Sequence, residues 1–129
     1  MAKQESGALG ALVDEYCNVW CEPDPELRRQ RLLPIWSHSA TYTDPTVHAA
    51  NSDELLAHIT KVLARRPGSK VRRTSIVDAH HGCVRFAWRV VQADGTSLSE
   101  GIDFMEVDDE GKIQRVIGFF GPLARSEDQ

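Results

Sequence analysis

The sequence predicts one domain of the α+β class, with helices first and a meander of antiparallel strands after them. Apolar residues recur at helical spacing as far as residue 63, and apolar and polar residues alternate from residue 71 onward. Turn signals at 94–95 and 108–111 divide the alternating half into strands. Helices grouped before hairpin-connected strands favour an α+β fold over repeated βαβ units. A length of 129 residues suits a single domain with its own core.

Two helical segments are predicted before the first strand. The first covers about residues 6 to 21, and its apolar face is formed by Leu9, Leu12, Val13, Tyr16 and Trp20. Pro23 ends this helix, and Asp24 and Pro25 suit the cap and the first position of the next one. Pro34 should kink or divide the second segment. The apolar positions of that segment are Leu27, Leu32, Leu33, Ile35 and Trp36.

A short strand and a third helix are predicted next. Residues 39–43 favour a strand that ends at Asp44 and Pro45, which are turn residues. Asn51 can cap the following helix, with Glu54 three residues later as in a capping box. A basic pair followed by proline and glycine ends this helix. Its buried face is predicted to consist of Leu55, Leu56, Ile59, Val62 and Leu63.

Four strands complete the domain. They are predicted over about 71–79, 83–92, 98–107 and 113–120, and the polar tail after Gly121 is predicted to be loose. A sheet of this length must twist and curl. Helices packed on its concave side can leave a cavity, which is a usual place for a small-molecule site. In the second of these strands, one face carries Val84, Phe86, Trp88 and Val90.

Composition and charge limit the partners of the protein. The formal net charge of −4 argues against a nucleic-acid binder, and no apolar run approaches the roughly 20 residues that span a membrane. The first residues lack the apolar stretch of a secretory signal, so a cytoplasmic location is expected. One basic cluster is interpreted as a helix end and a solvated strand rather than a phosphate site. It consists of Arg65, Arg66, Lys70, Arg72 and Arg73.

No metal site and no cofactor are expected. The three cysteines include no CxxC pair, and Cys17 and Cys21 are interpreted as small buried hydrophobic residues. The five histidines show no spacing of metal ligands, and the adjacent His80 and His81 should point to opposite faces of a strand. The sequence has no glycine-rich phosphate loop and no nucleophile motif.

Three short segments resemble one superfamily. They are Ala-Thr-Tyr-Thr-Asp-Pro at 40–45, Gly-Ile-Asp-Phe at 101–104 and Gly-Phe-Phe-Gly at 118–121. Over about residues 8–122 the sequence resembles the nuclear transport factor 2-like (NTF2-like) superfamily, most closely its Δ5-3-ketosteroid isomerases, with the SnoaL-like polyketide cyclases as relatives. The resemblance implies a cone, in which three helices pack on a curved, mostly antiparallel sheet around a pocket. It also implies a homodimer formed through the outer face of the sheet.

The resemblance assigns roles to three residues. Tyr16 and Asp103 match the oxyanion hole of the isomerases, and Asp44 matches their general base. Removing a proton next to a carbonyl creates an enolate, so the base must return the proton to another carbon while donors in a dry site hold the oxygen. A carboxylic acid kept neutral in an apolar site, as in these isomerases, can be such a donor. The expected substrate is a small cyclic, mostly apolar carbonyl compound, bound also by Trp20, Trp36, Phe86, Trp88, Met105 and Phe119.

Each of the three residues also has a purely structural interpretation. Tyr16 lies on the apolar face of its helix and could be a core residue, and Asp44 before a proline could be only a turn residue. Asp103 is harder to explain, because a carboxyl on an apolar strand face is costly without a partner or a function. Only two tyrosines are present, so the supporting tyrosines of some isomerases are missing.

Two other functions stay open. The chain could be a non-catalytic module that binds a small molecule or dimerises, because a fold does not fix a function. It could also be a SnoaL-like cyclase, dehydratase or hydratase in which His80 or His81 replaces one of the acids. Convergence of Tyr16, Asp44 and Asp103 on one cavity would favour isomerase chemistry. A more polar ligand is expected if the side chains that point inward include any of His80, His81, Arg85 and Arg89.

Overall fold

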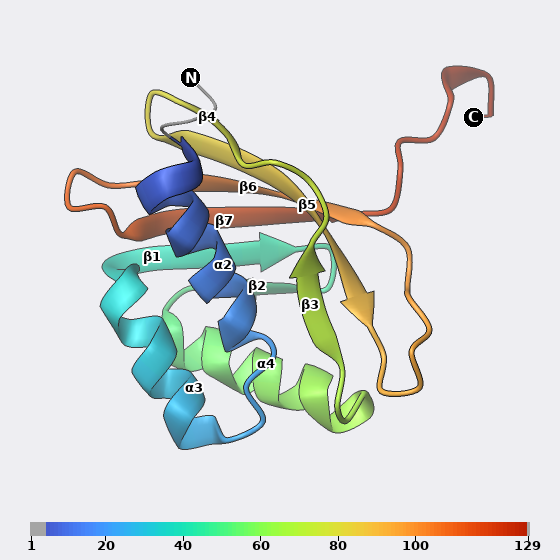
Figure 1. Cartoon of the computed structure of the whole chain (residues 1–129), viewed down its shortest axis with the longest axis horizontal. Coiled ribbons are helices and arrows are strands. Elements are labelled where there is room, and N and C mark those ends of the chain that lie inside the picture. Colours follow the sequence, from blue (N-terminus) through green and yellow to red (C-terminus); the bar gives the residue numbers. More distant parts are fainter. Residues whose placement is uncertain (1–4, 129) are drawn as a thin grey trace.

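The computed structural model describes residues 5–128 and has a helical layer packed on one curved sheet (Figure 1). The helical layer consists of η1 (Glu5–Leu9), α2 (Gly10–Val19), α3 (Pro25–Leu32), η2 (Leu33–Ile35) and α4 (Ser52–Arg65). Helix α2 crosses in front of the sheet in Figure 1, and α3 and α4 lie along its lower edge. The tail, with the short turn η3 (Ser126–Asp128), extends away from the body of the molecule.

Within the described residues, seven strands form one mixed sheet in the order β2-β1-β7-β6-β5-β3, with β4 also paired to β5. Strands β1 and β7 run parallel, and the other pairs are antiparallel. The predicted α+β class, with three helices on a curved and mostly antiparallel sheet, is confirmed. The strands are β1 (Trp36–Asp44), β2 (Val47–Ala49), β3 (Lys70–Arg73), β4 (Asp78–His80), β5 (Cys83–Val91), β6 (Gly101–Val107) and β7 (Ile113–Phe120).

The predicted start signals of two helices are present as hydrogen bonds. The carboxylate of Asp24 accepts a bond of 2.9 Å from the backbone N–H of Glu26 at the start of α3. The side chain of Asn51 accepts one of 2.9 Å from the N–H of Glu54 at the start of α4, and Glu54 in turn accepts the N–H of Ala50 at 2.8 Å. Each cap satisfies an N–H without a helical partner, which is worth about 1 kcal/mol.

Some boundaries differ from the prediction, and the causes are local. Helix α2 begins at Gly10, after the π-helical turn η1, rather than near residue 6. Trp36, expected in the second helical segment, begins β1, because Pro34 allows only the short 3-10 turn η2 before the chain becomes extended. The strand expected over 71–79 is interrupted between β3 and β4, which pair with different parts of β5.

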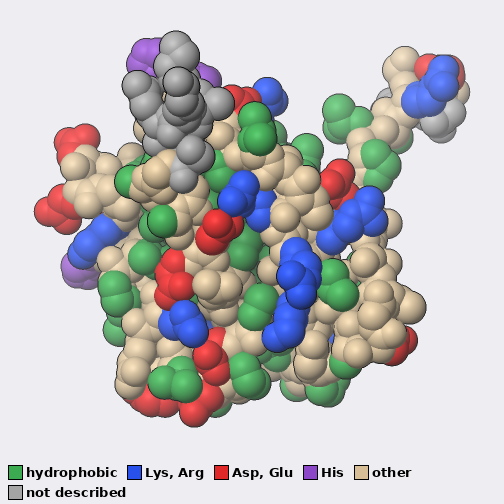
Figure 2. Space-filling model, in the orientation of Figure 1, with side chains coloured by type: hydrophobic (Ala, Val, Ile, Leu, Met, Phe, Trp, Pro, Cys, Tyr) green, Lys and Arg blue, Asp and Glu red, His purple; other side chains and the backbone are tan. Residues whose placement is uncertain are grey.

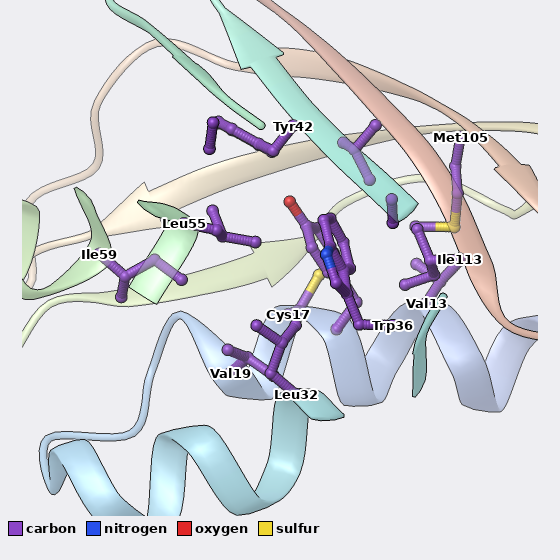
Figure 3. Close-up of a cluster of buried hydrophobic side chains, with 14 of the residues drawn as sticks. Val13, Cys17, Val19, Leu32, Trp36, Tyr42, Leu55, Ile59, Met105 and Ile113 are labelled. Atoms are coloured by element: carbon purple, nitrogen blue, oxygen red, sulfur yellow. The ribbon is translucent and has the colours of Figure 1, made fainter. Parts of the chain in front are cut away.

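The core lies between the helices and the inner face of the sheet. Figure 3 shows Trp36 among apolar side chains from every layer, and those that are fully buried include Val13, Leu32, Leu55 and Ile113. Burying an aliphatic side chain of this size contributes about 1.5–3 kcal/mol, so this cluster holds α2, α3 and α4 against the sheet. Among the described residues, no helix is long and apolar enough to cross a membrane. The cytoplasmic location stays a prediction.

Candidate active site

A cavity of about 250 Å³ lies between α2, α4 and the inner face of the sheet. Tyr16 on α2, Asp44 at the end of β1 and Asp103 on β6 all line it. The structure therefore brings the three residues that the resemblance singles out to one space. The volume is just below the range of roughly 300–1,000 Å³ that is usual for drug-sized ligands. This size favours a ligand of one or two rings.

The hydroxyl of Tyr16 has no acceptor for its proton among the described residues, although the indole of Trp20 is near enough to the hydroxyl oxygen to lower the pKa of Tyr16. The side chain is 2% exposed, and the hydroxyl oxygen itself is buried. The ring of Trp36 stacks on the ring of Tyr16, with centroids 6.5 Å apart and planes 8° from parallel, which fixes its orientation. Burial, with a smaller effect of Asp103, raises the pKa of Tyr16 well above its usual value of 10.0. Tyr16 is therefore a neutral donor at physiological pH.

Asp103 is a buried carboxyl with one side-chain partner. Its inward position follows from the alternation of β6, where Gly101, Asp103 and Met105 are buried and the residues between them are not. The indole Nε1–H of Trp88 donates to its Oδ1 at 2.9 Å. Burial raises the pKa of Asp103 to about 7, the Trp88 bond opposes this, and Asp44 adds to it. Near neutral pH, Asp103 can therefore hold a proton and act as a donor.

Asp44 is surrounded by donors instead. Its Oδ1 accepts hydrogen bonds of 2.7 Å from both the backbone N–H and the hydroxyl of Thr46. Its Oδ2 accepts one of 2.5 Å from the hydroxyl of Tyr42 and lies 3.8 Å from Nε2 of His58. The two acids of the cavity therefore differ in their hydrogen bonding, because the side chain of Asp44 accepts three hydrogen bonds and that of Asp103 accepts one.

Two glycines in the resembling segments make room for these groups. A Cβ built on Gly118 would lie 2.8 Å from Oδ1 of Asp103 and 3.6 Å from Cβ of Asp44, so both acids pack against this backbone. A Cβ on Gly101 would lie 2.4 Å from the ring of Trp88. Any side chain at Gly101 would displace the indole that donates to Asp103. The two glycines therefore position the acid pair and its donor.

The expected ligand-contacting residues divide into two groups. Trp20, Phe86 and Trp88 line the cavity and form an apolar wall. The other three, Trp36, Met105 and Phe119, are not among the residues that line it, so their contact with a ligand stays a prediction. Trp36 and Met105 belong to the buried apolar cluster that Figure 3 shows. Phe119 is 55% exposed because it alternates with the buried Gly118 on β7 and so faces outward.

His58 is a cavity residue that the sequence analysis does not single out. It lies on α4, its ring is 5.9 Å from that of Trp20 and 6.2 Å from that of Tyr42, and burial lowers its pKa below 6.5. Its position three residues after Leu55 and four before Val62, on the apolar face of the helix, is the signal that could have found it. The side chains of His80 and His81 are exposed, bond to each other and do not line the cavity.

The residues of the predicted basic cluster (Arg65, Arg66, Lys70, Arg72 and Arg73) do not all lie in one place. Arg65 and Arg66, at the end of α4, line the cavity, whereas Arg73 pairs with Asp14 outside it at 2.8 Å. Arg85 forms an ion pair with Asp78 and does not line the cavity. Within residues 5–128, no group of three His, Cys, Asp or Glu side chains is placed to bind a metal ion.

No family model matches the sequence, and no curated protein matches it. Among solved structures, a candidate isomerase of the SnoaL-like family from Agrobacterium tumefaciens is 28% identical, with 87% of this chain and 96% of that chain covered and a TM-score of 0.82. An NTF2-like protein of unknown function from Exiguobacterium is 16% identical, with 87% and 99% covered and a TM-score of 0.70. A candidate SnoaL-like polyketide cyclase from Jannaschia is 12% identical, with 84% and 83% covered and a TM-score of 0.63. The last two likenesses show a shared fold only.

Proposed function

We propose that this chain, which has the fold of NTF2-like and SnoaL-like proteins, catalyses proton transfer next to the carbonyl of a small cyclic, mostly apolar compound. The observation that carries the proposal is the buried, unpartnered hydroxyl of Tyr16 in the same cavity as the protonatable Asp103. A buried donor without a partner costs free energy, and a ligand oxygen would satisfy it. No cofactor is needed for this chemistry.

The proposed reaction uses each of the three residues once. The carboxylate of Asp44 removes a proton from the carbon next to the carbonyl, and the electrons of the C–H bond form an enolate. Tyr16 and the neutral Asp103 donate hydrogen bonds to the enolate oxygen. Asp44 then returns a proton, either the one it removed or one exchanged with solvent, to the same carbon or to another carbon of the conjugated system. Atoms and electrons balance without an oxidant or a second substrate.

Exchange of hydrogen for deuterium tests the proposal without knowledge of the natural substrate. The protein is incubated in D2O with a panel of one- and two-ring ketones and a Δ5-3-ketosteroid, and deuterium at the carbon next to the carbonyl is followed by NMR. We expect catalysed exchange that falls about 100-fold or more in Asp44→Asn, since general bases contribute 10²–10⁴-fold. Asp78→Asn, outside the cavity, should behave as wild type. Exchange by Asp44→Asn at nearly the wild-type rate would show that another group is the base.

A second candidate is a SnoaL-like cyclase, dehydratase or hydratase reaction, favoured by the presence of His58 beside Asp44. A neutral imidazole with a depressed pKa can take and give a proton in such reactions. The variant His58→Gln separates the two candidates in the same assay. Unchanged deuterium exchange supports the isomerase-type reaction through Asp44, whereas loss of exchange equal to that in Asp44→Asn favours the histidine-dependent one.

We also propose that a second copy of the chain covers the outer face of the sheet. Ile102, Phe104 and Phe119 are 41–55% exposed there, and the two phenylalanine rings pack edge to face at 6.0 Å. An exposed apolar patch beside charged pairs such as Arg115–Glu106 suits a twofold interface, in which each charge can meet its opposite. Light scattering after gel filtration should give a dimer for wild type and a monomer for Phe119→Arg. Leu123→Arg, in the 96% exposed tail, should stay dimeric, and a monomeric wild type contradicts the proposal.

A further inference from the structure

Two arginines stand at the solvent side of the cavity, opposite its buried acids. Arg65 and Arg66, at the end of α4, are exposed and also line the cavity. Tyr16 and Asp103, by contrast, are 2% and 5% exposed and mark its inner end. The cavity therefore has a neutral, hydrogen-bonding inner end, an aromatic wall and a positively charged opening.

Neither of these arginines has an acidic partner within the described part of the chain. Most of the other arginines form ion pairs, among them Arg31 with Glu15 and Glu22, Arg73 with Asp14, and Arg85 with Asp78. A guanidinium that has no partner and faces a cavity is available to a ligand, and its planar fork suits carboxylate and other oxyanions. Ser69 adds a buried residue with a hydroxyl to the same lining.

The positive field of this opening reaches the reaction site. The charges of Arg65 and Lys61 contribute to the lowered pKa of His58, which lies 3.8 Å from Asp44. On the face seen in Figure 2, further Lys and Arg side chains gather over β3, the strand that carries Lys70, Arg72 and Arg73. An anion that approaches this side of the molecule is therefore attracted before it enters.

We propose that the natural ligand carries an anionic group, which Arg65 and Arg66 bind, at the end opposite its reacting carbonyl. This inference rests on the proposed function for the position of the carbonyl end, at Tyr16 and Asp103. The aromatic wall of Trp20, Phe86 and Trp88 then contacts the apolar middle of the ligand. The substrate class is thus narrowed from apolar carbonyl compounds to small ring ketones that bear an acid.

A pair of matched probes tests the charged end separately from the carbonyl end. 2-Naphthol presents a ring hydroxyl to the inner donors, and 6-hydroxy-2-naphthoate has the same rings with a carboxylate at the far end. A sulfonate in place of the carboxylate tests whether the site distinguishes a planar anion from a tetrahedral one. Binding is measured by calorimetry at about pH 6, where Asp103 is mostly protonated and the carboxylate is ionised.

The expected result is a charge-dependent gain that belongs to the two arginines. Wild type should bind the carboxylate or the sulfonate about tenfold more tightly than 2-naphthol, as charge-assisted hydrogen bonds provide. The double variant Arg65→Gln/Arg66→Gln should lose this gain and keep its affinity for 2-naphthol. Arg89→Gln, which removes one such charge from an exposed position outside the cavity, should keep the gain.

The outcomes separate this inference from the proposed function. No gain for either anion, or an equal loss in Arg89→Gln, overturns the assignment of Arg65 and Arg66. If the wild type does not bind 2-naphthol, or if Tyr16→Phe binds it equally well, the result contradicts the binding of the carbonyl oxygen at Tyr16 and Asp103 instead. An arginine-dependent gain together with a Tyr16-dependent affinity for both probes supports the two assignments at once.

Discussion

Removing the hydroxyl oxygen of Tyr16 should make the protein more stable and weaken its binding of a ligand in the cavity. The variant Tyr16→Phe deletes the hydroxyl that is buried without a partner, and leaves the ring that stacks on Trp36. In the free protein this hydroxyl has lost its contact with water and gained no hydrogen bond. Its deletion should therefore relieve a cost rather than break an interaction.

The structure sets the size of both effects. An unsatisfied buried polar group costs about 1–3 kcal/mol, and Tyr16→Phe removes this cost. Part of the gain in stability is offset by the small void that the missing oxygen leaves. We expect a net stabilisation of about 1 kcal/mol, which is about 3 °C in Tm for a domain of this size. A hydrogen bond between neutral groups is worth about 0.5–1.5 kcal/mol, so affinity for 2-naphthol, whose hydroxyl is neutral near pH 6, should fall about 2- to 10-fold.

The matched control is the other tyrosine of the cavity. Tyr42 donates a hydrogen bond of 2.5 Å to Asp44, so Tyr42→Phe removes a satisfied contact and should lower the free energy of unfolding by about 1 kcal/mol. Urea denaturation measures both variants, and calorimetry with 2-naphthol measures binding. A Tyr16→Phe protein that is less stable than wild type would refute the reasoning, because it would mean that the hydroxyl has a partner in the folded state.

Two further predictions concern the acid of β6 and its indole partner. The pKa of Asp103 is about 7 in the folded protein against 3.8 usually, so the folded state holds more protons between these pH values. Its contribution to stability is then fully present below about pH 4 and is lost as pH rises through 7, by about 4 kcal/mol at most. Urea denaturation from pH 4 to 8 should show this loss in wild type and not in Asp103→Asn. Gly101→Ala should push Trp88 from its position and cost about 1–3 kcal/mol in the same assay, and a stability equal to wild type would contradict the close packing seen here.

Most of the fold could be predicted from local patterns. Caps at Asp24 and Asn51, the alternation of β5 and β6, and the two hairpin turns all depend on residues close in sequence, where propensity and periodicity are informative. The parallel pairing of β1 with β7 could not be predicted in this way, because no local signal identifies a partner so far along the chain. The three-residue β2 is too short to show a period.

The residues of the candidate site also differ in whether local sequence patterns could identify them. The inward direction of Asp103 followed from strand alternation, and Tyr16 and Asp44 were named only through the resemblance. The tertiary contacts decide which aromatic residues reach the cavity, so Trp36 could be placed on an apolar face by its sequence and still lie behind Tyr16. His58 and Arg65 depend on where the end of α4 lies relative to β1, which a single-sequence pattern does not contain.

The parallel pairing of β1 with β7 also determines the order in which the strands can pair while the chain is being synthesised. A chain leaving the ribosome can pair β5 with β6 as each appears, but β1 has only the three-residue β2 as a neighbour until Ile113–Phe120 has emerged. Until then, the strand that carries Asp44 presents an unpaired edge, a feature that promotes association between incomplete chains. The cavity closes when the last strand docks between β1 and β6, so a nascent chain completes its candidate site in the final step of folding.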